Sequence, residues 1–249
     1  MADANSTLSV SIVIPAFNEK ERLPSFFSSL LQQIQALKLR AELIIVDDGS
    51  REDHAAAYQQ LIRSTQTIPV HLLSHHVNLG KGAAIKTGFQ YSNTPWIGFA
   101  DADGSTSAEE VVRLALLAVN STDLDGVFGA RILMLGREVV RKQYRHVLGR
   151  VFTTLLDLQL RIPVYDSQCG CKFFRRATIF PLLELCKEQG WLFDAEIIAL
   201  GYFKHLHFLE VPISWRDVPG TKVRVLRDGI RMAIGLWRIR RRLKVLGLL

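Results

Sequence analysis

Two aspartates separated by one residue, Asp101 and Asp103, are the strongest candidates for chemistry in this sequence. They follow an apolar run, Trp96 to Ala100, where a strand is expected to end in a turn. Carboxylates at positions i and i+2 of such a turn can approach one hard divalent ion, which prefers oxygen ligands and also contacts phosphate oxygens. We therefore expect Asp101 and Asp103 to hold Mg²⁺ or Mn²⁺ next to a diphosphate, whose charge the ion neutralises.

Three other polar clusters follow apolar runs in the same way. Asp47 and Asp48 supply acceptors for the N–H groups of a base or the hydroxyl groups of a ribose. Lys81 stands between two glycines near an expected helix start, which suits a phosphate, although the spacing of a Walker A loop is missing. Each cluster alone also fits an ordinary turn or helix cap. The clusters are Pro15-Ala16-Phe17-Asn18-Glu19, Asp47-Asp48-Gly49-Ser50 and His75 to Gly82.

Alternating strands and helices must position these clusters. Short apolar, β-branched runs alternate with stretches of helical spacing, which predicts right-handed βαβ units and a mostly parallel α/β sheet covered by helices on both faces. Ligands of such Rossmann-like sheets bind at the carboxyl ends of the strands, where the polar clusters fall. The expected strands are 10–14, 43–46, 70–73, 96–100 and 126–130, and the expected helices are 23–37, 54–62, 83–91 and 108–119.

The regular alternation of predicted strands and helices ends at Arg131. The pattern predicts a long helix over 139–160, a turn region rich in Cys and Gly, helices near 180–187 and 195–201, and a strand at 207–214. The composition is that of a globular chain, with 48% hydrophobic and 22% charged residues. Without a repeat, a low-complexity segment or a linker, we expect one domain over 1–220, followed by an amphipathic C-terminal helix over 221–249.

The C-terminal helix carries most of the positive charge. The net charge is +7, and the segment from Lys222 to Lys244 alone holds nine Lys or Arg and one Asp, a charge of +8. An apolar stripe lies beside this basic face at helical spacing, a pattern typical of a helix in an anionic membrane surface. We expect that contact, with packing of the stripe on the domain as the alternative. The stripe consists of Met232, Leu236, Ile239, Leu243 and Leu246.

Cysteine usage and hydropathy bear on location. Cys169, Cys171 and Cys186 have neither the spacing of a redox pair nor a second pair to complete a zinc site, so we expect reduced thiols and a cytoplasmic location. The opening segment lacks the basic region of a signal peptide, and no apolar run approaches the roughly 18 residues of a membrane span. We expect a protein that is peripheral on the cytoplasmic face of a membrane.

Taken together, these residues resemble family 2 glycosyltransferases, which are inverting enzymes of the GT-A fold. The motifs SIVIPAFNE, LIIVDDGS, NLGKG and DAD stand in the order and rough spacing of that family. Four motifs of the second half are similar to those of dolichyl-phosphate β-glucosyltransferases and their prokaryotic relatives, namely GAR at 129–131, DSQCGCKFF at 166–174, WLFDAEI at 191–197 and VPISWRDVPGTKV at 211–223. The resemblance covers nearly the whole chain.

The resemblance implies roles for individual residues. Asp101 and Asp103 would hold the metal and the diphosphate, and Arg131 would face the phosphate of the acceptor. The expected catalytic group is Asp103, Arg131, Asp166, Asp194 and Glu196, and at least one of its last three members would contact the sugar or act as a base for a hydroxyl acceptor. The nucleotide would lie against Pro15, Ala16, Asn18, Glu19, Asp47, Asp48, Lys81, Asp101 and Ala102. Arg137, Arg141 and Arg145 would bind the acceptor phosphate or form a solvated helix face.

The implied reaction is an inverting, metal-dependent transfer of a sugar to a polyprenyl or dolichyl phosphate, with glucose as the sugar and a UDP-sugar as the donor favoured. This acceptor is already anionic, so its oxygen attacks without a strong base. A transferase acting on a glycan or protein hydroxyl is the alternative, and it needs a carboxylate base. A nucleotidyltransferase would instead release pyrophosphate. A nucleic-acid-binding protein would leave the acidic clusters unexplained, and we expect no nucleic-acid partner.

Overall fold

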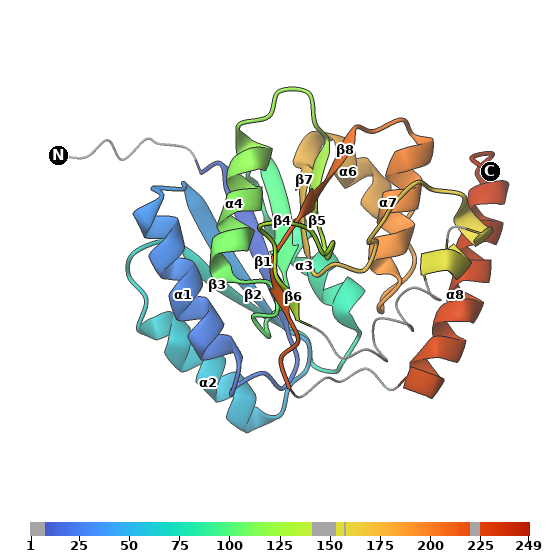
Figure 1. Cartoon of the computed structure of the whole chain (residues 1–249). Helices are drawn as coiled ribbons and strands as arrows, with labels where there is room; N and C mark the ends of the chain where they lie inside the picture. The colour runs from blue at the N-terminus through green and yellow to red at the C-terminus, as the bar shows by residue number, and fades with distance from the viewer. Residues whose placement is uncertain (1–7, 141–152, 157, 220–224) are drawn as a thin grey trace.

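Strands and helices alternate over the first half of the chain, as expected. The computed structural model describes residues 8–140, 153–156, 158–219 and 225–249 (Figure 1). All five strands and four helices predicted before Arg131 are confirmed, with ends within two residues of those expected. They are β1 (Val10–Ala16), α1 (Leu23–Ala36), β2 (Ala41–Asp47), α2 (Glu52–Arg63), β3 (Val70–Ser74), α3 (Lys81–Tyr91), β4 (Trp96–Ala100), α4 (Ala108–Val119) and β5 (Gly126–Ala130).

The second half departs from the predicted pattern in two places. The expected turn region contains a buried strand, β7, and the expected helix over 139–160 begins instead with strand β6, which pairs with β9. Residues 153–156 and 158–160 of that expected helix are helical, while 141–152 and 157 lie outside the described residues. The elements are β6 (Val139–Val140), β7 (Cys171–Arg175), α6 (Arg176–Leu183), α7 (Phe193–Phe203), β8 (Phe208–Pro212), β9 (Trp215–Arg216) and α8 (Val225–Val245).

The main sheet is mostly parallel, which confirms the predicted fold class. Its strand order is β3-β2-β1-β4-β7-β5-β8. Only β7 among these strands runs antiparallel to its neighbours, β4 and β5. Because β1 lies between β2 and β4, the chain leaves β1 toward one edge of the sheet and later returns to its other side. The loops that follow β1 and β4 therefore flank a topological switch point, where ligands of open α/β sheets bind.

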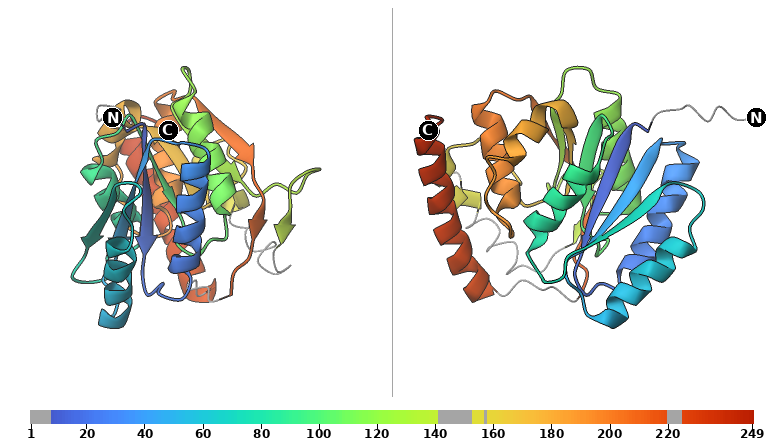
Figure 2. Two further views of the ribbon diagram at one scale, coloured as in Figure 1. Left: turned by 90° about the vertical axis from the view of Figure 1, so that its left-hand side faces the viewer. Right: turned by 180° about the vertical axis from the view of Figure 1, so that it is seen from behind.

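Helices cover both faces of the sheet because side chains alternate along each buried strand. Ile12 and Leu43 belong to the core cluster under α1, α2 and α4. Val13 and Ile44 belong to the opposite cluster, which they share with α3, α6, α7 and α8. Figures 1 and 2 show the two helical layers on either side of the strands. The polar loops at the carboxyl ends of the strands thus stand on a rigid, doubly covered sheet.

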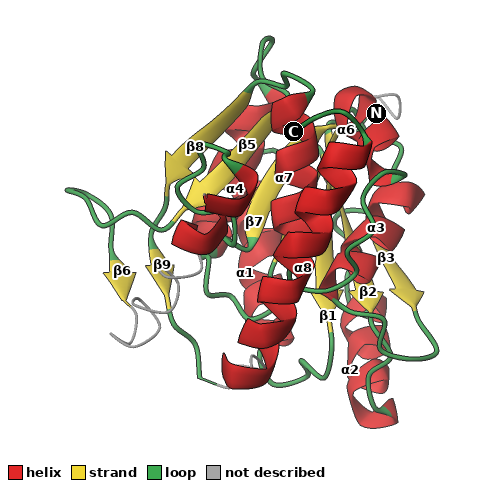
Figure 3. Ribbon diagram, turned by 90° about the vertical axis from the view of Figure 1, so that its right-hand side faces the viewer, coloured by secondary structure: helices red, strands yellow, loops and turns green. Residues whose placement is uncertain are grey.

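Helix α8 packs its apolar stripe on the domain. Leu236, Ile239 and Leu243 are buried in the same core cluster as α7, and Figure 3 shows α8 lying across this helical layer. The expectation that this stripe contacts a membrane was therefore wrong for these three residues, since burial against α7 already removes their surface from water. None of the helices in the described part of the chain has the length and apolar character needed to cross a bilayer.

A buried polar cluster ties the amino ends of the central strands together. Ser11 is fully buried, and its hydroxyl lies 2.6 Å from Ser92 Oγ and 2.7 Å from Thr94 Oγ1. The same hydroxyl donates to the buried carboxylate of Glu42, whose other oxygen is 3.3 Å from His71 Nε2. Buried polar groups of this kind stabilise a fold only while they keep their partners. The cluster joins β1, β2 and the turn before β4 at the amino ends of these strands, opposite the polar loops.

Replacing Ser11 by Ala should lower the free energy of unfolding by about 1–3 kcal/mol, because Glu42, Ser92 and Thr94 each lose a buried partner. Urea titration followed by far-UV circular dichroism measures this. As a matched control, Ser64→Ala removes an exposed hydroxyl that donates to Leu61 O at the end of α2, and it should change stability by about 0.5 kcal/mol or less. Equal losses in the two variants would contradict the proposed importance of the Ser11 cluster.

Candidate active site

The polar loops predicted from the sequence meet at one rim of the sheet. The backbone N–H of Asp48 donates to Ala16 O at 2.8 Å, which joins the loops after β1 and β2. The N–H of His75 donates to Asp47 O at 2.8 Å, which adds the loop after β3. The loop after β4 starts next to β1 in the parallel register. The common rim expected for the four clusters is therefore present.

An ion pair between Asp101 and Lys81 stands at the centre of this rim. Lys81 Nζ lies 2.6 Å from Asp101 Oδ1, and the Lys81 side chain is 11% exposed. Burial alone would lower the pKa of Lys81, but the charges of Asp101 and Asp194 raise it above its usual value. The ammonium also lies over the rings of Phe99 and Trp191, at 5.2 and 5.7 Å from their centroids. Lys81 is therefore a fixed positive charge that faces the Asp101 carboxylate.

Asp103 borders an open surface beside Asp101. Its Oδ1 accepts from Ser105 N at 3.0 Å, and its Oδ2 lies 3.7 Å from Arg22 Nη1. Burial and the negative charge of Asp101 raise the pKa of Asp103 above its usual range. Asp103 also lines a groove of about 570 Å³ between α1 and α4. The two aspartates thus form a region of negative charge that ligands reach from solvent.

The second half of the chain closes directly onto Asp101. Asp101 N donates to Gly170 O at 2.9 Å, and a Cβ atom added to Gly170 would lie 1.9 Å from Asp101 Oδ2. No side chain fits that space, so the carboxylate reaches its position only because residue 170 is glycine. This contact explains the chemical need for glycine within the Cys-Gly-Cys segment, and it brings the motifs of the two halves into one site.

A second carboxylate, Asp194 at the start of α7, lies between two lysines. Its Oδ2 is 3.9 Å from Lys81 Nζ, and its Oδ1 is 3.2 Å from Lys172 Nζ. Lys172 is completely buried on β7 and also donates to Cys169 O. The contact of Asp194 Oδ1 with Lys172 is an ion pair without hydrogen-bond geometry, because this oxygen has no hydrogen-bond partner within the described part of the chain. Asp101, Lys81, Asp194 and Lys172 form a cluster of alternating charge, called the charge cluster below.

Asp48 shapes the turn that carries Lys81. Its two carboxylate oxygens accept from Leu79 N at 2.9 Å and Gly80 N at 2.8 Å, and Oδ1 also lies 2.7 Å from His75 Nδ1. Gly80 has a φ of 107°, a conformation that favours glycine. Asp48 therefore holds the Gly80–Lys81 turn in place. Its expected contact with a nucleotide stays a prediction.

The loop after β1 is fixed by contacts with the loop after β2. Asn18 adopts a φ of 53°, donates from its backbone N to Ser50 Oγ at 2.9 Å and accepts from Arg51 N at 3.0 Å. Asp47 Oδ1 accepts from Ser50 N at 3.0 Å. Glu19 N donates to Tyr58 Oη at 2.6 Å. Pro15 and Ala16 end β1, and Ala102 is buried between the two aspartates. All the residues expected at the nucleotide therefore lie along this rim.

Arg131, at the end of β5, is paired with Asp166. Its Nε and Nη2 lie 2.7 Å from the two carboxylate oxygens of Asp166, and its backbone N donates to the same carboxylate at 3.0 Å. The guanidinium lies 5.3 Å from the ring centroid of Trp215. Burial alone would raise the pKa of Asp166, but the Arg131 guanidinium lowers it to about 2. Two residues predicted for catalysis are thus in direct contact and permanently charged at neutral pH.

Two other predicted residues, Glu196 and Arg137, do not join this group. Glu196 follows Asp194 by two positions on α7, so its side chain leaves the helix on the opposite side, where it binds Arg242 and the backbone before α7. Arg137 lies 2.7 Å from Glu110 Oε1. Arg141 and Arg145 lie outside the described residues. The contacts of Glu196 are those of a structural anchor. The expectation that at least one of Asp166, Asp194 and Glu196 contacts the sugar or acts as a base stays a prediction.

The donor set at the rim fits a hard divalent cation. Asp101 and Asp103 present carboxylates that are 33% and 28% exposed, respectively, and the Lys81 ammonium compensates part of their charge. Within the described residues no group of three or more His, Cys, Asp or Glu side chains is arranged to hold a metal. Two protein carboxylates together with phosphate oxygens are a normal donor set for Mg²⁺, which binds few protein ligands and dehydrates reluctantly.

Lys172 is the site residue that sequence reasoning missed. It belongs to the sequence CKFF, in which the other three residues are all buried. A lysine inside such a run is rarely buried without a carboxylate partner, so the pattern itself indicated an ion pair. The identity of that partner, 22 positions later in the chain, required the fold.

The depressed pKa of Asp166 predicts an acid-sensitive contribution to stability. The ionised carboxylate stabilises the fold above the ordinary pKa of about 4, and about 2 kcal/mol is lost as pH falls from about 4 toward 2. The difference in unfolding free energy between the wild type and Asp166→Asn should therefore narrow as pH falls from 6 to 3, as measured by urea titration. The exposed control Asp123→Asn should show a small difference throughout. If the difference in unfolding free energy between the wild type and Asp166→Asn did not change with pH, the proposed contribution of the ionised Asp166 carboxylate would be refuted.

Comparisons with known proteins agree with this geometry. Residues 11–180 match the family described as Glycosyl transferase family 2. Dolichyl-phosphate β-glucosyltransferases of Saccharomyces cerevisiae and Dictyostelium discoideum are each 31% identical over 93% of this chain, covering 74% and 73% of those proteins. Glucosyl-3-phosphoglycerate synthase from Mycobacterium tuberculosis in complex with UDP superposes with a TM-score of 0.66 at 17% identity, over 96% of this chain and 80% of that one.

Mannosyl-3-phosphoglycerate synthase from Rubrobacter xylanophilus shares the fold as well, with a TM-score of 0.67 at 18% identity, over 97% of this chain and 76% of that one. The family match covers more than half of the chain and includes β1, the Lys81 turn, Asp101 and β7. Since the match spans most of the residues that build the site, the chain belongs to glycosyl transferase family 2 and is a glycosyltransferase.

Proposed function

We propose that this glycosyltransferase transfers a sugar, with inversion, from a nucleotide-sugar donor to a polyprenyl phosphate, with UDP-glucose as the favoured donor. The observation that carries the proposal is the charge cluster at the topological switch point, with Asp101 fixed against Gly170 and facing Lys81. The names of the two curated relatives reported above support the acceptor, because both are called dolichyl-phosphate β-glucosyltransferases.

On the donor side, Asp101 and Asp103 would hold Mg²⁺ or Mn²⁺. The ion, when bound, neutralises the negative charge that develops on the leaving diphosphate. The complex of the mycobacterial synthase with Mn²⁺ and UDP-glucose motivates this choice of metal and donor. Lys81 supplies a second positive charge to the same diphosphate, because its ammonium already faces Asp101. Asn18, Glu19 and Asp47 would bind the nucleoside at the rim.

On the acceptor side, Arg131 would bind the phosphate, since a guanidinium pairs with phosphate oxygens in a planar, bidentate way. Asp166 orients this guanidinium through its two hydrogen bonds. The chain that follows Arg131 supports a lipid acceptor, because Leu133 and Leu135 are 77% and 100% exposed. Exposed apolar side chains at a loop tip are typical of contact with a lipid or another apolar partner.

The contacts of Asp194 favour a phosphate acceptor over a hydroxyl acceptor. Its carboxylate already makes ion pairs with Lys81 and Lys172, and a general base would have to accept a proton at the same oxygens. A phosphate oxygen is anionic before the reaction and requires no such base. Catalysis then depends on placing the nucleophile in line with the anomeric carbon and stabilising the departing nucleotide. Asp194 would accept hydrogen bonds from the sugar.

The function is tested by incubating the protein with UDP- or GDP-sugars, a short polyprenyl phosphate and Mn²⁺ or Mg²⁺. We expect a glycosyl phospholipid and a free nucleoside diphosphate, separated by chromatography. Asp101→Asn and Asp103→Asn should each reduce kcat/KM at least about 100-fold, because the charge that offsets the cation is lost. Asp123→Asn, which removes an exposed carboxylate elsewhere, should keep normal activity. Release of pyrophosphate, or full activity of both Asp101→Asn and Asp103→Asn, would contradict the proposed function.

We also propose that the chain binds the cytoplasmic face of a membrane through the outer face of α8. This face is defined by Ile234, Trp237, Arg238, Arg241 and Val245, which share one side of the helix. Ile234, Trp237 and Val245 are 53%, 57% and 82% exposed, and Arg241 stacks over Trp237 at 5.9 Å. Indole rings and arginines together suit the interface of an anionic bilayer.

Trp237→Ala should weaken binding to vesicles of phosphatidylcholine and phosphatidylglycerol about tenfold, because the indole no longer leaves water on binding. Cosedimentation measures the bound fraction, and added salt should weaken binding of the wild type. Leu117→Ala is the control, since Leu117 is a 41% exposed apolar residue on α4, on the other face of the sheet. Equal binding of both variants would exclude the outer face of α8 as the membrane contact.

A further inference from the structure

Residues 184–191, which belong to the loop between α6 and α7, lie between α8 and the turn that carries Lys81. Glu196, on α7, holds this loop, because its Oε2 accepts from the backbone N–H groups of Lys187 at 2.8 Å and Glu188 at 2.6 Å. The thiol of Cys186 lies 3.2 Å from the same oxygen. One buried carboxylate thus fixes three consecutive residues of the loop.

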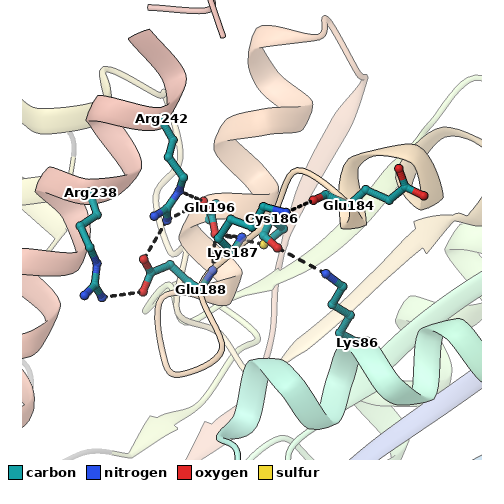
Figure 4. Close-up of polar contacts among 8 residues, drawn as sticks. All are labelled: Lys86, Glu184, Cys186, Lys187, Glu188, Glu196, Arg238 and Arg242. Carbon is teal, nitrogen blue, oxygen red and sulfur yellow. Dashed lines mark hydrogen bonds and ion pairs between the residues drawn. The ribbon is translucent and has the colours of Figure 1, made fainter. Parts of the chain in front are cut away.

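Arg242 of α8 completes this anchor. Its Nε is 2.7 Å from Glu196 Oε1 and its Nη2 is 2.7 Å from Glu188 Oε1, so one guanidinium joins α7 and the loop (Figure 4). Arg238 adds a weaker contact with Glu188 at 3.1 Å. The side chains of Glu196 and Glu188 are 3% and 10% exposed. Loss of Arg242 would leave two poorly solvated carboxylates close together, which is strongly unfavourable.

The other side of the loop contacts the Lys81 turn. Gln189 O accepts from Ala83 N at 3.0 Å, in the first turn of α3. A Cβ atom on Gly80 would lie 2.6 Å from Gln189 O, so the loop backbone sits directly against the turn. Trp191 then places its ring 5.7 Å from Lys81 Nζ. Displacement of the loop would therefore move the surface that holds Lys81 in front of Asp101.

We infer that Arg242 and Glu196 are positioning residues for donor binding, acting through loop 184–191 on Lys81. The inference rests on the proposed function, because it assumes that Lys81 contacts the donor diphosphate. It gives α8 a second role: besides burying an apolar stripe, the helix keeps the donor site in its working geometry. The expected sensitivity is large, since small displacements of a binding group have large effects on a preorganised site.

The experiment compares Arg242→Gln with Arg240→Gln. Both variants remove one arginine from the same helix, but the hydrogen bonds of Arg240 within the described residues go to Gln159. Arg242→Gln should raise the KM for UDP-glucose about tenfold with a much smaller change in kcat, and Arg242→Lys should recover part of the loss. Arg240→Gln should keep the KM of the wild type. Thermal denaturation verifies that the variants are folded.

A second readout requires no substrate. In a Trp237→Phe background, Trp191 is the most exposed tryptophan, and its quenching by acrylamide should increase in Arg242→Gln but not in Arg240→Gln. If Arg242→Gln does not fold, Glu188→Gln weakens the same bridge while Glu196 keeps Arg242. Unchanged quenching overturns the anchor whether or not UDP-glucose is the donor, and increased quenching with an unchanged KM overturns its role in donor binding. If the wild type shows no turnover, the proposed function is wrong. The acrylamide quenching of Trp191 then still tests whether Arg242 holds the loop.

Discussion

The ion pair between Asp101 and Lys81 is the contact around which the site is arranged. A carboxylate at the carboxyl end of a buried strand is only partly solvated, and an adjacent positive charge stabilises it there. Lys81 provides that charge at 2.6 Å, and Asp194 and Lys172 extend the pattern so that positive and negative groups alternate. The anionic donor and cation proposed for this site would meet a region that is already organised for charge, which would limit reorganisation during the reaction.

This arrangement depends on elements far apart in the chain. Asp101 directly follows β4, Lys81 is the first residue of α3, Lys172 lies on β7 and Asp194 on α7. The antiparallel insertion of β7 between β4 and β5 brings Lys172 next to Phe99 and aims it at α7. Gly170 then lies so close to Asp101 that any side chain would displace the carboxylate. The second half of the chain thus helps to build the candidate site.

Helix α8 shows why amphipathic patterns are ambiguous. Its sequence contains two apolar stripes, and burial of Leu236 and Ile239 on the domain leaves Ile234 and Trp237 on the outer face. Helical spacing identifies residues that share a face, but the surface that covers this face depends on neighbouring elements. The same reasoning applies to Glu196, which shares a motif with Asp194 but leaves α7 on the other side and anchors α8 instead.

The sequence by itself determined the alternating α/β fold, the strand ends that carry Asn18, Asp47, Lys81 and Asp101, and the family. Local periodicity and turn residues are sufficient for the fold and its loops, because each strand of a parallel sheet is specified by its own apolar run. The family was indicated by the resemblance of the motifs SIVIPAFNE, LIIVDDGS, NLGKG and DAD. Only the tertiary structure decided that β7 is a strand, that Lys172 is the partner of Asp194, and that Arg131 is held by Asp166. Those features are pairings between segments that are distant in the chain. The interaction that favours each partner becomes strong only when folding removes both groups from water.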